Sequence, residues 1–113
     1  MSITPFRYVF KPIKRGFDFE WSFFWFDDAG DALNLTGSTV SCILWDRKRE
    51  VQLAVMGLAT ISLNPGNTRH FLTAVQTAAL EGPVPYELRL LEPDGSLQCY
   101  MDGIMTFVDF LPP

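Results

Sequence analysis

Side chains that build catalytic and metal sites are scarce in this chain. Its 113 residues include one histidine, His70, and two cysteines, Cys42 and Cys99, which lie far apart and lack the Cys-x-x-Cys spacing of zinc and redox sites. No serine or cysteine lies in a nucleophile motif, and the eight glycines are dispersed instead of forming a phosphate-binding loop. We therefore expect a protein that is not an enzyme and that holds neither a cofactor nor a metal ion.

The few candidate ligands have simpler interpretations. His70 falls on a predicted strand edge, where a surface or packing role is favoured over a catalytic one. Cys42 and Cys99 fall at inward-facing positions of predicted strands, which favours buried free thiols over a disulfide. The aspartates of segment 27–31 lack the acidic residue that closes a calcium-binding loop at its twelfth position, so a solvated hairpin turn is expected there.

Basic residues and long apolar runs are also few. Nine lysines and arginines against thirteen acidic residues give a net charge of -4, which disfavours binding to a nucleic-acid backbone. The basic cluster Arg47-Lys48-Arg49 is flanked by Asp46 and Glu50, a pattern typical of a solvated hairpin loop. No apolar run approaches the roughly 20 residues that span a bilayer, and the first residues do not resemble a signal peptide. We expect no nucleic-acid or membrane partner, and synthesis in the host cytoplasm.

Aromatic residues, by contrast, are abundant, and they follow a clear period in segment 16–26. Large rings occupy every odd position from Phe17 to Trp25, while Asp18, Glu20 and Ser22 fall between them. A period of two is what a β-strand with one buried face requires. The segment is therefore predicted to be one long strand whose rings line the core.

The remaining pattern predicts an all-β chain. Strands are expected over residues 6–13, 39–46, 51–56, 59–63, 86–91 and 97–107, with turns at Asn64-Pro65-Gly66-Asn67 and Glu92-Pro93-Asp94-Gly95. One short helix is expected over about 73–80, with Thr73 as its N-cap and Gly82-Pro83 after its end. The last strand is expected to keep one face, from Leu97 to Phe107, without a register break. We predict a single domain over residues 1–113, an immunoglobulin-like antiparallel β-sandwich of about seven strands.

Some apolar residues fall on the second faces of these strands, beyond what one small sandwich needs. They are Phe24, Phe26, Ile104, Val108 and Phe110. Surplus exposed apolar surface usually marks an interface, so these five residues are predicted to contact a partner protein or another copy of the chain. The tryptophans could alternatively form a platform that stacks on sugar rings, although their strand period favours a place in the core.

The order of these signals resembles small phage and prophage virion domains of immunoglobulin-like type, similar to the N-terminal domain of phage baseplate upper proteins. The matching pieces are the segments 16–19, 28–40, 72–80, 86–88, 93–95 and 103–107. The resemblance implies a structural domain that attaches to a tail, baseplate or fibre in several copies and carries out no chemistry. The chain departs from that family because no helical or receptor-binding extension follows Phe110.

Two functions from different classes follow from this. The first is a structural or adaptor component of a phage virion, in its tail, baseplate or fibre attachment, that acts through protein–protein assembly with other virion proteins or with itself. The second is a carbohydrate-binding β-sandwich module.

Overall fold

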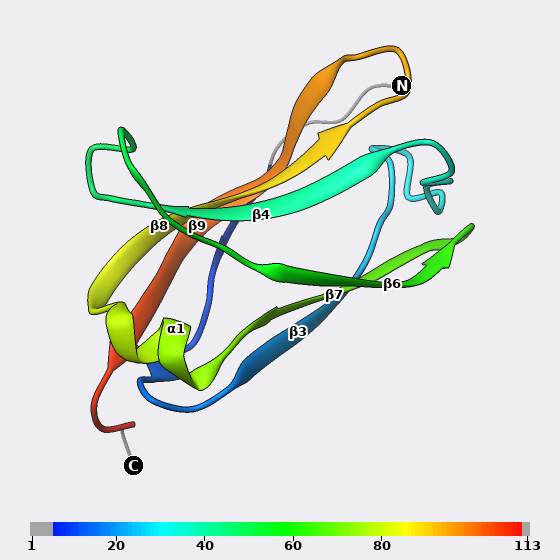
Figure 1. The fold of residues 1–113 in the computed structure, drawn as a ribbon. Coiled ribbons are helices and arrows are strands. Elements are labelled where there is room, and N and C mark those ends of the chain that lie inside the picture. The colour runs from blue at the N-terminus through cyan, green and yellow to red at the C-terminus, as the bar shows by residue number, and fades with distance from the viewer. Residues whose placement is uncertain (1–5, 112–113) are drawn as a thin grey trace.

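The computed structural model describes residues 6–111 and arranges them as two β-sheets packed face to face (Figure 1). The ends of the predicted 1–113 domain, residues 1–5 and 112–113, lie outside the described residues. One sheet has six strands in the order β1-β9-β8-β4-β5, with β2 also paired to β9, and the other has three in the order β3-β7-β6. The strands are β1 (Phe6–Val9), β2 (Ile13–Lys14), β3 (Phe19–Phe24), β4 (Thr39–Trp45), β5 (Gln52–Val55), β6 (Gly57–Leu63), β7 (Gly66–Leu72), β8 (Gly82–Leu91) and β9 (Leu97–Val108).

The predicted all-β sandwich with one short helix is confirmed. The described residues hold nine strands instead of about seven, because residues 6–14 form two short strands and segment 66–72, where the sequence indicated only a strand edge at His70, forms a full strand. The sandwich is also not purely antiparallel, since β1 and β2 both pair with β9 in parallel. The expected strand over 16–26 is shorter, because Arg15 to Asp18 form the turn before β3 and Phe26 makes only an isolated bridge to Ala32.

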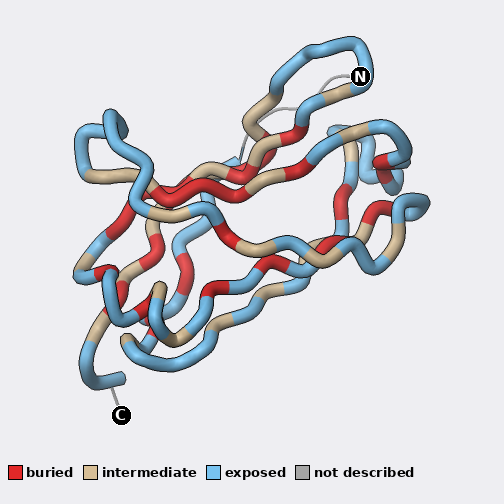
Figure 2. Tube along the Cα trace, viewed as in Figure 1, coloured by how far each residue is buried: buried red, intermediate tan, exposed pale blue. Residues whose placement is uncertain are grey.

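The centre of the core lies on the inner face of the six-stranded sheet. Alternate residues of β8, namely Val84, Tyr86, Leu88 and Leu90, point inward and are almost completely buried. Figure 2 shows the buried positions concentrated along β4, β8 and β9, with exposed positions alternating along the three-stranded sheet. The β8–β9 hairpin closes at the predicted turn, where Asp94 Oδ1 accepts a hydrogen bond of 2.8 Å from the Ser96 amide. This hairpin is therefore the frame on which the other strands assemble.

Strand β1 lies at one edge of the six-stranded sheet. It is placed by Gly103 of β9, because a Cβ atom at that position would overlap the carbonyl group of Tyr8. The Tyr86 hydroxyl also donates a hydrogen bond of 2.6 Å to the Tyr8 carbonyl oxygen. The glycine at position 103 of β9 therefore permits the close approach of another backbone, which is that of β1.

The last strand, however, does have a register break. The pairing of β9 with β8 shifts between Met101, which lies opposite Leu88, and Cys99, which lies opposite Arg89, so Tyr100 forms a bulge. Tyr100 and Met101 are consequently both buried, although they are adjacent. The expectation of one unbroken face was wrong, and Cys99 is half-buried and not in the core.

Helix α1 (Ala74–Ala79) forms where predicted, at the end of the sandwich near the C-terminus (Figure 1). Thr73 caps it through a capping box: its hydroxyl accepts from the Gln76 amide, and the Gln76 side chain accepts from the Thr73 amide. Asp18 Oδ1 accepts a third bond, 2.8 Å long, from the Ala74 amide. The helix is thereby joined to the turn that precedes β3.

Candidate interaction surfaces

The only histidine is fully buried in the interior of the sandwich. His70 is completely buried, and β7, on which it lies, is the central strand of the three-stranded sheet, so the expected edge position was wrong. Its Nε2 atom lies 2.9 Å from Thr68 Oγ1, which also accepts a 2.9 Å hydrogen bond from Trp25 Nε1. Burial lowers the pKa of His70 to about 4. The packing role that the sequence favours fits this buried row of three hydrogen-bonded side chains, Trp25, Thr68 and His70.

The cysteines and acidic residues offer no reactive cluster. Cys42 and Cys99 are free, and burial raises the pKa of Cys42 to about 12, so its thiolate form is strongly disfavoured. Across residues 6–111, no three side chains of histidine, cysteine, aspartate or glutamate gather closely enough to hold a metal ion. Over the same range, no helix has the length and apolar character needed to cross a bilayer.

The five residues predicted as an interface do not form one patch. Phe24, 56% exposed, lies at the end of β3 on the outer face of the three-stranded sheet. Ile104 and Val108 are half-buried on the outer face of the six-stranded sheet, on the other side of the molecule. Phe26 is exposed in the loop after β3, where its backbone exchanges hydrogen bonds with the Tyr100 hydroxyl, and Phe110 is 86% exposed beyond β9. No single partner surface contains all five.

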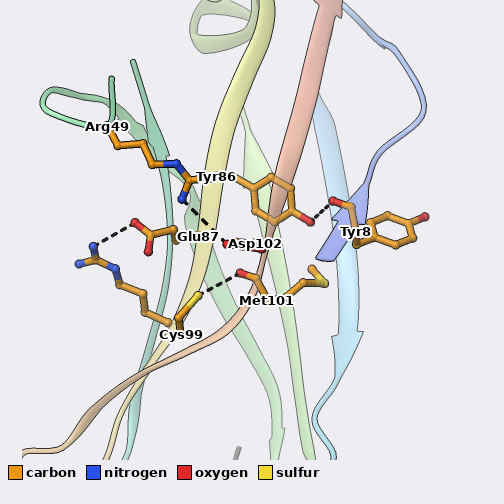
Figure 3. Close-up of polar contacts among 8 residues, drawn as sticks. Tyr8, Arg49, Tyr86, Glu87, Cys99, Met101 and Asp102 are labelled. Carbon is orange, nitrogen blue, oxygen red and sulfur yellow. Dashed lines mark hydrogen bonds and ion pairs between the residues drawn. The ribbon is translucent and has the colours of Figure 1, made fainter. Parts of the chain in front are cut away.

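The outer face of the six-stranded sheet carries charges that pair with one another (Figure 3). Arg49, from the β4–β5 loop, reaches across to within 4.0 Å of Asp102 on β9. On β8, Arg89 forms an ion pair of 3.2 Å with Glu87. Cys99 lies beside these groups, and its pKa is raised by burial and, to a smaller extent, by Glu87 and Asp102. The charges of this face are therefore largely satisfied within the chain.

A groove opens between β1 and β3, the outermost strands of the two sheets on one side of the sandwich. Its volume is about 380 Å³, and we call it the aromatic groove. It is lined by Tyr8, Phe10, Ile13, Phe17, Phe19 and Trp21, with Lys11, Lys14, Asp18 and Glu20 at its rims. A smaller adjoining pocket continues it past Phe6 and Phe23. The rings pack edge to face, as Phe10 does against Trp21 with ring centres 5.0 Å apart.

Charges of opposite sign mark the two rims of the aromatic groove. Lys11 and Lys14 belong to the β1–β2 side, whereas Asp18 and Glu20 belong to the β3 side. Lys14 lies over the Phe17 ring, 4.8 Å from its centre, and Asp18 caps helix α1. Lys11 and Glu20 are exposed, and neither has an ion pair or hydrogen bond to another described side chain.

The opposite side of the sandwich has an aliphatic surface, which we call the aliphatic edge. Here the chain passes directly from β5, at the edge of one sheet, to β6, at the edge of the other, through the buried Met56. Its exposed large side chains are Val51, Leu53, Val55, Leu58, Ile61 and Leu63. None of these residues is charged, so this edge lacks the charge pattern of the aromatic groove.

The tryptophans do not form an open platform. Trp25 is completely buried, while Trp21 and Trp45 are half-buried. The Arg89 guanidinium lies over the Trp45 ring, 5.4 Å from its centre, and Phe10 packs its edge against Trp21. The core interpretation of these rings therefore fits Trp25 fully and Trp21 in part, whereas it is wrong for Trp45, which lies on the outer face of β4 beside Arg89.

Comparison with known proteins bears on the fold. No protein-family description and no curated protein matches the sequence. Among solved structures, the chain is similar to the crystal structure of the Lin-41 filamin domain, with 16% sequence identity and a TM-score of 0.50 over 89% of this chain and 86% of that one. The likeness and the two-sheet topology define an immunoglobulin-like β-sandwich of filamin type. The predicted immunoglobulin-like fold is confirmed, whereas the likeness to phage baseplate proteins stays a prediction.

Proposed function

We propose that this chain is a non-enzymatic structural or adaptor module that acts through protein–protein assembly. The observation that carries the proposal is the unequal width of the two sheets. The six-stranded sheet is five strands wide, because β1 and β2 lie along the same edge of β9, and it faces a sheet of only three, so the outermost strands β1 and β5 are incompletely covered. Strands β1 and β5 each expose large apolar side chains along an open strand edge. Such an edge is a surface to which another chain can bind.

The rest of the molecule supports an assembly role over a chemical one. The histidine and Cys42 are buried with pKa values shifted away from the reactive range, and charges on the outer face of the six-stranded sheet pair with one another. An adaptor needs neither a nucleophile nor a proton donor. The partners that we propose are other virion proteins and the chain itself, in a phage tail, baseplate or fibre attachment; the phage assignment rests on the sequence resemblance.

The test of this proposal is recovery of the protein in particles. Phage or prophage particles from cells that carry the gene are purified on a density gradient, and the protein is quantified against the major capsid protein by mass spectrometry. We expect a fixed copy number per particle, because symmetric assemblies contain a defined number of copies of each subunit. Recovery of the protein only in the soluble fraction, from cells that do release particles, overturns the virion assignment.

Carbohydrate binding is the second candidate, and the aromatic groove is the observation that favours it. Half-exposed rings beside the carboxylates of Asp18 and Glu20 are the kind of surface that binds a sugar through stacking and hydrogen bonds. Titration with a broad panel of host-surface oligosaccharides, followed by tryptophan fluorescence, tests it. A flat response throughout the panel excludes this candidate, and saturable quenching that disappears in Trp21→Ala supports it.

A further inference from the structure

The aromatic groove has two free strand edges. Among residues 6–111, β1 pairs only with β9 and β3 only with β7, so within this range each leaves alternate backbone N–H and C=O groups without a strand partner on the groove side. Between them, Phe19, Trp21 and Phe23 of β3 point toward the core but remain half-exposed. A surface with these two properties binds a partner that supplies both strand pairing and apolar side chains.

The rim charges restrict which partner fits. Lys11 on the β1 side and Glu20 on the β3 side are exposed, opposite in sign and without partners in the described part of the chain. A second copy of the chain carries the same two charges on the same two rims. The groove is therefore complementary in charge to itself, provided that the second copy is turned so that its acidic rim meets the basic rim of the first.

Only one type of twofold axis achieves this. When two grooves face each other across a twofold axis that runs along the strands, the two rims are exchanged, so Lys11 of each copy faces the acidic rim of the other. A twofold axis across the thickness of the sandwich instead places like-charged rims together, which costs free energy. The symmetry also extends each sheet across the interface, because β1 of one copy meets β3 of the other.

We propose that the aromatic groove is a self-interface, in which two copies associate about this axis with Lys11 and Glu20 paired reciprocally. The inference rests on the proposed assembly function and identifies a second copy of the chain as a partner. Apolar contact between the facing rings provides the affinity, whereas the rim charges select the orientation, since exposed ion pairs by themselves contribute little.

Reciprocal charge reversal tests the proposal. Lys11→Glu alone gives a chain with two acidic rims, and Glu20→Lys alone gives one with two basic rims, so each is expected to dimerise at least tenfold more weakly than the native chain. In an equimolar mixture, both cross-pairs become attractive again, and a heterodimer of near-native affinity is expected. The double variant Lys11→Glu/Glu20→Lys is likewise expected to regain dimerisation. Sedimentation equilibrium over a concentration series measures all four dissociation constants.

The matched controls are Lys48→Glu and Glu81→Lys, which make the same charge changes at exposed positions away from the groove rims. These controls are expected to dimerise within twofold of the native chain. The four altered side chains are all exposed, so folding should be preserved, and far-ultraviolet circular dichroism verifies this. A native chain that stays monomeric at millimolar concentration overturns the proposal and indicates that a different protein occupies the groove. A dimer that no rim reversal weakens, or single variants whose mixture fails to associate, overturns it as well.

The outcome is separable from that of the virion proposal. Reciprocal rescue in the purified chain, with no protein in particles, retains the self-interface and removes the virion role. A strictly monomeric chain that is nevertheless recovered in particles removes the self-interface and retains the virion role.

Discussion

The two sides of this sandwich arise from the same mismatch between a six-stranded and a three-stranded sheet, yet they differ in chemistry. On one side, β1 is fixed by Gly103 and by the Tyr86 hydroxyl, and it borders a groove whose rings are flanked by lysines and carboxylates. On the other side, β5 pairs with only the end of β4, and the exposed residues are uncharged aliphatic ones. Charges that flank an apolar groove restrict the orientation in which a partner binds, whereas an uncharged aliphatic edge restricts that orientation less.

The largest expected effect comes from acid, and it concerns the core beneath the aromatic groove. His70 packs against Trp21, with ring centres 5.5 Å apart, and must stay neutral because it is buried. The unfolded chain takes up a proton near pH 6.5, whereas the folded chain resists it until about pH 4. Stability is therefore complete above pH 6.5 and falls by about 3 kcal/mol as the pH decreases from 6.5 to 4.

Urea unfolding at a series of pH values measures this loss, and His70→Gln is the control that removes the titrating group. The variant should be less stable at pH 7 but should lack most of the decline between pH 6.5 and 4. An equally steep decline in the variant would assign the pH dependence to carboxylates instead.

The next largest effect is expected from a variant that displaces β1, the strand on the aromatic-groove side of the comparison. In Gly103→Ala the new methyl group overlaps the Tyr8 carbonyl, so we expect a loss of roughly 2–3 kcal/mol of unfolding free energy together with faster hydrogen exchange in β1. Gly30→Ala is the matched control, because that glycine also has a positive φ, +85°, but has no neighbouring atom within 4 Å of the added methyl. The control should lose only about 1 kcal/mol. Equal losses in the two variants would contradict the steric explanation.

A smaller effect is expected from the hydrogen bond that joins β1 to the core. Tyr86→Phe removes the hydroxyl that donates a 2.6 Å hydrogen bond to the Tyr8 carbonyl oxygen. We expect the unfolding free energy to decrease by about 1 kcal/mol. The phenyl ring still fills the core, so chemical denaturation should show a lower midpoint with an unchanged slope. A change in the slope would mean that the variant alters the compactness of the native or denatured state instead of removing one hydrogen bond.

The smallest change in stability is expected at the aliphatic edge. Val55→Lys places a charge on exposed β5 and should change the unfolding free energy by less than about 0.5 kcal/mol. It should nevertheless reduce aggregation at high concentration, which light scattering measures, because a lysine on an edge strand opposes strand pairing. If it also abolished the defined dimer, the self-interface would have to lie on this side instead.

Much of the fold could be predicted because its signals are local. The alternation of Phe19, Trp21 and Phe23 with Glu20 and Ser22 corresponds to the observed half-burial of β3. The capping box at Thr73 and the turn at Asp94 depend on neighbouring residues alone. Patterns of this kind need no information about distant parts of the chain.

Other elements escaped prediction because the residues that define them have distant partners. Strand β7 buries the polar Thr68 and His70, and it does so only because Trp25, from another segment, supplies a hydrogen bond. The bulge at Tyr100 is likewise explained by its hydroxyl, which bonds to the backbone of Phe26. Alternation identified Phe24 and Ile104 as outward-facing, but it gives no indication that they belong to different sheets.

The sequence by itself determined an acidic, all-β chain with aromatic strands and scarce catalytic side chains, since composition and strand period are properties of the residues. Only the tertiary structure decided that β1 and β3 border one groove, with charges of opposite sign on its two rims. The reason is that strand order and sheet width depend on pairing between residues far apart in sequence, such as Tyr8 with Gly103, which a local pattern cannot specify.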